Sequence, residues 1–145
     1  NPIRMKNLQT ALAALCISTT LLFTSCSPDY DQVSGTEEVL TRNAWEIDHF
    51  SRSSQNLTSE YTNNTLYFSN NGTLICRNGA DQCTGTWSYS GNTMGETIII
   101  QLNSNDTKML QLNHAWQLRS RNLSNILLEQ TDPAVNSELR IRVTQ

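Results

Sequence analysis

The sequence predicts an all-β domain: an antiparallel, eight-stranded up-and-down barrel. Its first sign is the alternation of apolar and polar side chains in short segments, as where Leu139, Ile141 and Val143 alternate with Arg140 and Arg142. Such a period of two is typical of strands with one buried face. Turn-forming residues separate these segments at short intervals, and neither long helical periodicity nor βαβ alternation occurs. Many short strands with short links favour a barrel or a strongly rolled sheet.

The expected strands follow one another along most of the chain. They are residues 44–50, 65–69, 73–77, 84–90, 97–102, 115–121, 125–130 and 138–144. Asn70-Asn71-Gly72 and Ser90-Gly91-Asn92 are expected hairpin turns, because Asn and Gly accept the positive φ that such reversals need. A long polar link is expected over residues 51–63, and a helical turn over residues 109–113. A barrel of eight strands is either filled by its own side chains or holds one small ligand.

The first 25 residues have the pattern of upstream residues followed by a secretory leader. Met5 is the expected start, Lys6 supplies a short charged region, and an apolar stretch runs over residues 11–23. That stretch is too short and too rich in Ser and Thr for a spanning helix, which needs roughly 20 apolar residues. It fits the apolar core of a signal peptide, so residues 1–25 are expected to be removed.

The end of the leader is the most specific motif in the chain. Phe23-Thr24-Ser25-Cys26 resembles the lipobox of bacterial lipoprotein precursors. The resemblance implies that the Cys26 thiol receives a diacylglyceryl group, that the leader is cut before it, and that the new amine is acylated. Two or three acyl chains make a stable anchor, since each buried methylene contributes ~0.8 kcal/mol. We therefore expect an outer membrane lipoprotein that faces the periplasm or the cell surface. Residues 26–39 would be its flexible tether, and residues 40–145 its domain.

Cys76 and Cys83 remain after the leader and the lipid site are assigned. An even pair in a disulfide-permissive compartment predicts a disulfide that closes a hairpin end. A loop this short would stabilise the fold by about 2–3 kcal/mol. The alternative, a metal or redox pair, has less support. Two Cys with six residues between them and no nearby His make a poor zinc site. The Cys-x-x-Cys spacing of redox enzymes is absent.

The domain resembles the lipocalin-like domains of many bacterial lipoproteins. The matching segments, in order, are residues 40–47, 66–73, 85–87, 98–100, 112–116, 126–128 and 139–141. The resemblance implies binding of a small hydrophobic ligand inside the barrel, lined by Trp45, Phe68, Trp87 and Trp116. The alternative is that these side chains are the core of a filled barrel. The protein would then be a non-catalytic structural or interaction module that contacts envelope proteins or glycans.

Charge and motifs argue against several other functions. Once Arg4 and Lys6 leave with the leader, 8 basic and 13 acidic residues remain, a net charge of −5. Nucleic acid binding needs clustered Lys and Arg, and no such cluster exists. His49 and His114 have no partners at metal-ligand spacing, and no Gly-x-Ser-x-Gly elbow occurs. We expect no enzyme, cofactor or metal. His49 shares the face of Trp45 on its strand, so it is expected at the barrel interior or rim.

Overall fold

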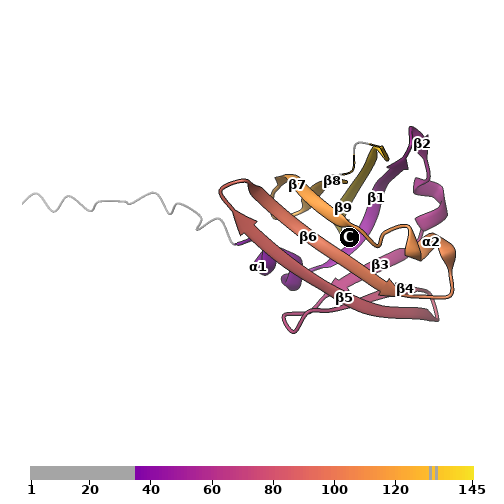
Figure 1. Ribbon diagram of the computed structural model, residues 1–145. Helices are drawn as coiled ribbons and strands as arrows, with labels where there is room; N and C mark the ends of the chain where they lie inside the picture. Colours follow the sequence, from indigo (N-terminus) through magenta and orange to yellow (C-terminus); the bar gives the residue numbers. More distant parts are fainter. Residues whose placement is uncertain (1–34, 131, 133) are drawn as a thin grey trace, which may run out of the picture. The chain divides into compact units, whose positions relative to one another are not determined.

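A computed structural model describes residues 35–130, 132 and 134–145 (Figure 1). Cys26 and the expected leader lie outside the described residues. The elements are α1 (Thr36–Arg42), β1 (Ala44–Arg52), β2 (Gln55–Asn56), the 3₁₀ helix η1 (Thr58–Tyr61), β3 (Asn64–Phe68), β4 (Thr73–Asn78), β5 (Asp81–Asn92), β6 (Gly95–Asn103), α2 (Thr107–Leu110), β7 (Ala115–Arg121), β8 (Asn125–Gln130) and β9 (Ser137–Val143).

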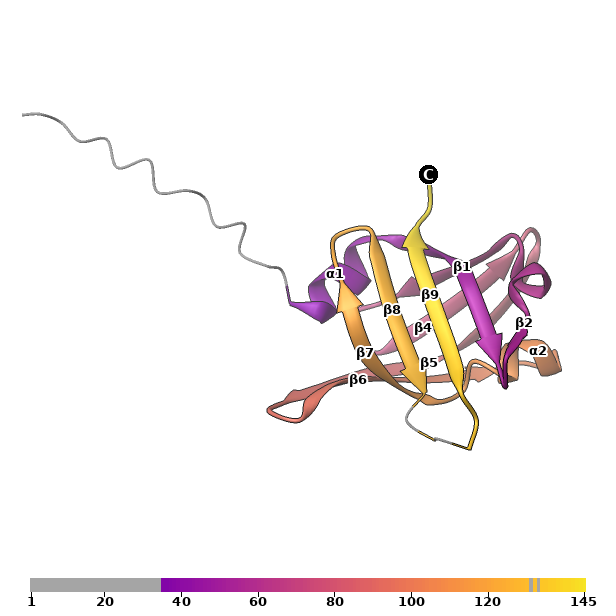
Figure 2. The same cartoon turned by 90° about the horizontal axis from the view of Figure 1, so that it is seen from above.

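The strands form one antiparallel sheet that closes on itself. Their order is β2-β1-β3-β4-β5-β6-β7-β8-β9, and β1 also pairs with β9, with Trp45 opposite Val143 and Ile47 opposite Ile141. Strand β2 is two residues long and pairs only with the end of β1. Across the part of the chain that the structure describes, β1 and β3–β9 therefore make a closed eight-stranded barrel (Figure 2), which confirms the predicted fold class.

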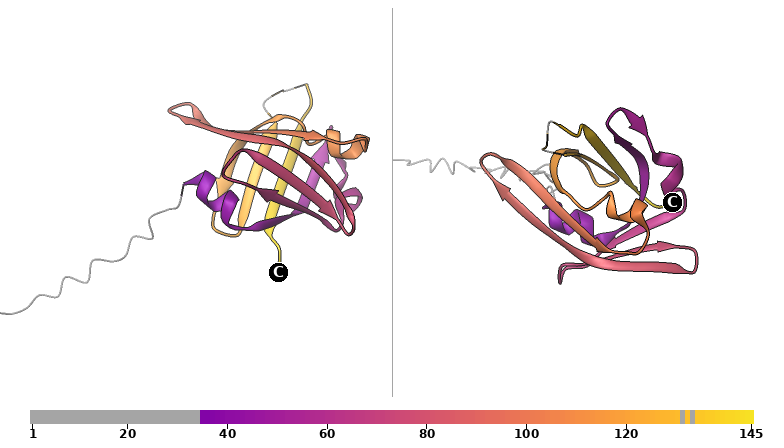
Figure 3. Two further views of the ribbon diagram at one scale, coloured as in Figure 1. Left: turned by 90° about the horizontal axis from the view of Figure 1, so that it is seen from below. Right: turned by 45° about the vertical axis from the view of Figure 1, so that its right-hand side comes forward.

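The up-and-down order defines two ends of the barrel (Figure 3). At the α1 end lie α1 and the turns β3–β4, β5–β6 and β7–β8. At the α2 end lie η1, the β4–β5 turn, α2 and the β8–β9 connection. We use these two names below.

Helix α1 places the start of the fold before the expected boundary at residue 40. Thr36, Val39 and Leu40 are buried, at the i, i+3, i+4 spacing of a helical stripe that packs on a core. The Thr36 hydroxyl also donates to Glu96 Oε2 at 3.0 Å. Residues 36–39, assigned to the tether, therefore belong to the domain. The rule of strand alternation could not detect them, because their period is helical.

The expected polar link over residues 51–63 is also more ordered than predicted. It contains β2 and η1, and η1 places Tyr61 against the core, 1% exposed. The Tyr61 hydroxyl donates to the Lys108 carbonyl at 2.7 Å, and its ring meets Phe50 edge-on at 5.1 Å. The Tyr61 side chain thus anchors this polar segment at the α2 end.

A β-bulge corrects the predicted position of His49. The register between β1 and β9 shifts between Ile47 and His49, and an extra residue in one strand turns the following side chains to the opposite face. Phe50 is consequently fully buried. His49 is only half-buried, with its Nδ1 3.5 Å from the Thr58 hydroxyl. Of the two expected positions, interior and rim, it does not occupy the interior.

Candidate functional site

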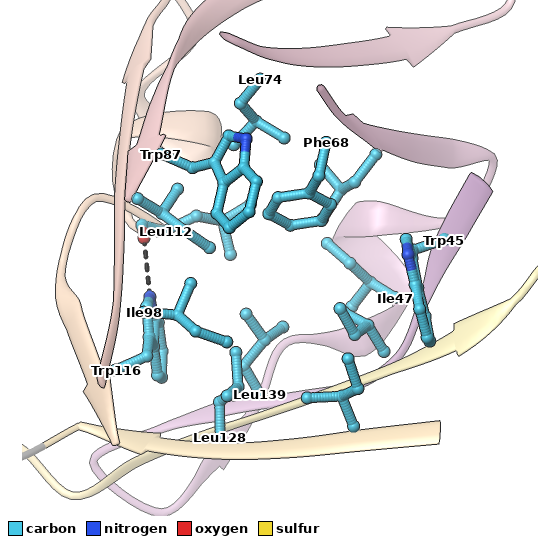
Figure 4. Packing of buried hydrophobic residues seen from close by; sticks show 14 of the residues in the cluster. Trp45, Ile47, Phe68, Leu74, Trp87, Ile98, Leu112, Trp116, Leu128 and Leu139 are labelled. Carbon is cyan, nitrogen blue, oxygen red and sulfur yellow. Dashed lines mark hydrogen bonds between the residues drawn. The ribbon is translucent and has the colours of Figure 1, made fainter. Parts of the chain in front are cut away.

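The four aromatic residues predicted to line a ligand cavity all belong to one packed core (Figure 4). Trp45 and Trp116 are 0% exposed, Phe68 4% and Trp87 6%. Phe68 and Trp87 meet edge-on with ring centroids 5.3 Å apart, and Trp116 contacts Phe50 in the same way at 6.3 Å. The alternation predicts that these four side chains face inward, and in the structure they pack into the core that fills the barrel.

Each indole N–H is used to hold a segment that closes an end of the barrel. Trp45 donates to the Leu40 carbonyl in the last turn of α1, at 2.9 Å. Trp87 donates at 2.9 Å to the carbonyl of Ser69, in the turn between β3 and β4.

The third indole, that of Trp116, donates at 2.9 Å to the Leu112 carbonyl after α2, the bond that Figure 4 marks. A buried indole N–H needs such a partner. The three tryptophans therefore fill the barrel and fasten segments at both of its ends.

A polar pocket of about 370 Å³ opens at the α2 end. Its wall combines η1, the start of β3, the β4–β5 hairpin and the chain around α2, and the charged groups there include Glu60, Asp106 and Lys108. Lys108 Nζ lies 3.7 Å from Glu60 Oε2. Asp106 accepts from the Lys108 backbone N–H at 2.9 Å, which caps α2. This pocket is polar, unlike the apolar interior that the lipocalin-like resemblance implies.

Cys76 and Cys83 lie directly opposite each other on β4 and β5, and both line this pocket. Both are free thiols, so the predicted disulfide is not present in this structure. Directly opposite residues hold their Cβ atoms about 4.5–5.5 Å apart, whereas a disulfide needs about 3.8 Å. Bridging would therefore draw the two strands together. Burial, and then the neighbouring Cys83, raise the pKa of the Cys76 thiol well above its usual range.

Each histidine ring has one uncharged side chain within hydrogen-bonding range: Thr58 for His49 and Gln130 for His114. His114 Nδ1 lies 3.3 Å from the Gln130 side-chain amide nitrogen, and the His114 ring meets Trp116 edge-on. Burial, and then the positive charge of Arg52, lower the pKa of His114 below 6.5. Within residues 35–130, 132 and 134–145, no group of three or more His, Cys, Asp or Glu side chains is placed to hold a metal ion.

No helix among the described residues is long and apolar enough to cross a membrane.

The fold and its interior define a class of protein: a small, closed, up-and-down β-barrel of eight strands whose aromatic residues fill it. No protein-family model matches the chain, and no curated protein matches it. Among solved structures, the chain is similar to the crystal structure of a DUF4847 family protein from Bacteroides vulgatus ATCC 8482. The TM-score is 0.53 at 13% identity, over 74% of this chain and 96% of that one. At this identity the likeness is one of fold.

Proposed function

We propose that this protein is a lipid-anchored, non-catalytic module of the cell envelope, and that its filled barrel presents its ends to an envelope protein or glycan. The observation that carries the proposal is the use of the interior. The residues expected to line a ligand cavity pack against one another, and all three indole N–H groups already have backbone partners. A small hydrophobic ligand inside the barrel, the other reading of the lipocalin-like resemblance, would have to displace close-packed side chains, which is costly.

The proposed anchor limits how far the α1 end can lie from the membrane. Nine residues lie between Cys26 and Thr36, the first residue of α1, so ten Cα–Cα steps join the two. Fully extended, such a segment reaches at most about 35 Å. A lipid on Cys26 would therefore hold the α1 end within that distance of the bilayer. The α2 end, with its polar pocket, would be the end free to meet a partner.

Ligand binding is tested on the wild-type chain against a variant with an opened core. Phe68→Ala should lose about 3–5 kcal/mol of stability and leave a cavity, and such an apolar cavity binds small molecules such as benzene. We expect benzene or a hydrophobic dye to change the tryptophan fluorescence of Phe68→Ala and leave that of the wild type unchanged. Saturable micromolar binding of a fatty acid by the wild type would refute the filled-barrel proposal.

Anchoring and contact are tested in cells. Metabolic labelling with a palmitate analogue should mark the wild type and fail to mark Cys26→Ser. A photo-crosslinking residue at exposed Asn105, at the α2 end, should give one defined adduct, whereas exposed Ser88 on the barrel wall should give none. Labelling of Cys26→Ser, or identical adducts from both positions, would contradict the proposal.

A further inference from the structure

Three sulfur atoms converge at the polar pocket of the α2 end. Cys76 from β4 and Cys83 from β5 face each other across the hairpin, and Met109 comes from α2. Cys76 Sγ lies 3.5 Å from Met109 Sδ and 3.6 Å from Asn64 Oδ1. All four of these residues line the pocket. We call Cys76, Cys83 and Met109 the sulfur cluster.

We propose that the sulfur cluster is a binding site for one soft, thiophilic metal ion of the Cu(I) class. Thiolate and thioether ligands select soft ions of this kind over Mg²⁺ or Ca²⁺, which prefer oxygen. Two sulfurs bound to one ion at about 2.3 Å lie about 3.8–4.0 Å apart, for angles between tetrahedral and trigonal. The 3.5 Å between Cys76 Sγ and Met109 Sδ therefore needs to widen by only a few tenths of an ångström.

The site is built as metal sites are: buried ligands beside an opening. Cys76 is 2% exposed and Met109 6%, while Cys83 is half-buried. The pocket supplies the path by which an ion enters.

Binding releases two protons and forms three metal–sulfur bonds. Each thiol loses its proton to solvent and becomes a thiolate, and the Met109 thioether binds without change of charge. Two thiolates around a monovalent ion have a net charge of −1, and Lys108 lines the same pocket as an ion pair with Glu60.

Asn64 is a positioning residue for the cluster. Its buried Oδ1 now accepts from the Cys76 thiol. Rotation of the amide by half a turn would present its N–H groups to a thiolate instead, since an Asn side chain both accepts and donates.

A disulfide between Cys76 and Cys83 would consume the same two sulfurs. The metal site and the disulfide are therefore mutually exclusive, which makes the proposal testable.

The test uses the full chain with Cys16→Ser and Cys26→Ser, so that Cys76 and Cys83 are its remaining thiols. The reduced protein is titrated without oxygen against a coloured Cu(I) chelator. We expect one Cu(I) per chain and three sulfur neighbours by X-ray absorption. Cys83→Ser should abolish this binding. Met109→Leu should weaken it about 10–100-fold, the range seen when one supporting group of a metal site is lost.

Met94→Leu is the matched control, because Met94 is 86% exposed at the tip of the β5–β6 hairpin. It should bind Cu(I) like the parent chain, and the near-ultraviolet circular dichroism of all variants should stay native. Equal affinity of Met109→Leu and Met94→Leu would overturn the three-sulfur site. A Cys76–Cys83 disulfide, found by mass spectrometry in the wild-type chain alkylated as cells are lysed, would overturn the proposal as a whole.

Discussion

Replacing Trp45 by Phe should detach α1 from the barrel and cost more stability than the same change at Trp116. Both indoles are 0% exposed, and both donate to a backbone carbonyl at 2.9 Å. The acceptors differ. The Leu40 carbonyl lies in the last turn of a helix, where the helix supplies no N–H partner. The Leu112 carbonyl also accepts from the His114 backbone N–H at 2.9 Å.

The magnitudes follow from this difference. Each substitution removes one net hydrogen bond, worth about 0.5–1.5 kcal/mol, and roughly 1 kcal/mol of apolar ring burial. Trp45→Phe also leaves a buried carbonyl without a partner, which costs about 1–3 kcal/mol more. We expect losses of about 3–4 kcal/mol for Trp45→Phe and about 2 kcal/mol for Trp116→Phe.

Urea unfolding measures both losses of stability, provided that the free energy of unfolding falls with urea concentration at the same slope in the two variants. Hydrogen exchange adds a local readout: the amides of α1 should lose protection in Trp45→Phe and keep it in Trp116→Phe. Equal losses of stability in the two variants, or unchanged protection of α1, would refute the assigned role of the Trp45 indole.

Three further perturbations test other parts of the structure. Gly85→Ala should prevent folding or cost several kcal/mol, because its Cβ would lie 2.0 Å from the Gln101 carbonyl on β6. Gly35→Ala has nothing within 4 Å of its Cβ and should cost only about 1 kcal/mol in thermal melts, because it weakens the N-cap of α1. The free energy of unfolding should decrease as pH falls below 6.5, since burial lowers the pKa of His114 in the folded chain and protonation then favours the unfolded chain. His114→Gln should remove this contribution to the pH dependence, measured as urea midpoints from pH 7 to 5. Arg142→Ala should cost less than about 1 kcal/mol, and still less at high salt, because its ion pairs across the β1–β9 seam are exposed.

Strand positions were predicted well because each strand has one buried face. Strands β7 and β8 lie over the residues expected from alternation, 115–121 and 125–130. Strand β5 is longer than expected, running from Asp81 to Asn92, because its polar ends extend beyond the part that faces the core. Backbone pairing with β4 and β6 continues there without any apolar pattern to mark it.

The errors arose where tertiary contacts override local pattern. Helix α1 is seven residues long, and an isolated helix of that length is not stable in water. It is stabilised by burying Val39 and Leu40 against the barrel. Tyr61 is one aromatic residue in a polar stretch, and its partner carbonyl, that of Lys108, is 47 residues away. The bulge at Asp48 leaves no trace in the alternation of β1 until the register with β9 is known.

For the candidate site, too, local pattern predicts some features and tertiary contacts decide the others. Alternation found Trp45, Phe68, Trp87 and Trp116, because it reports which side chains face inward. It could not find what the indoles hold, since their partners are backbone carbonyls, which no sequence pattern marks. Met109 was missed as a neighbour of Cys76 for the same reason: 33 residues separate them, and only the closing of the α2 end brings them together.

The filled interior and the closed ends are two consequences of the same residues. The barrel interior holds three indoles beside Phe50, Phe68 and Tyr61. Each buried indole must then place its N–H near an acceptor such as a carbonyl. In this chain the acceptor carbonyls of Leu40, Ser69 and Leu112 all lie outside the strands, in segments at the barrel ends. Opening the interior to a ligand would break the contacts that hold those segments in place. We therefore expect binding at an end of the barrel and not in its interior. The α2 end, with its polar pocket and sulfur cluster, is the end where we expect it.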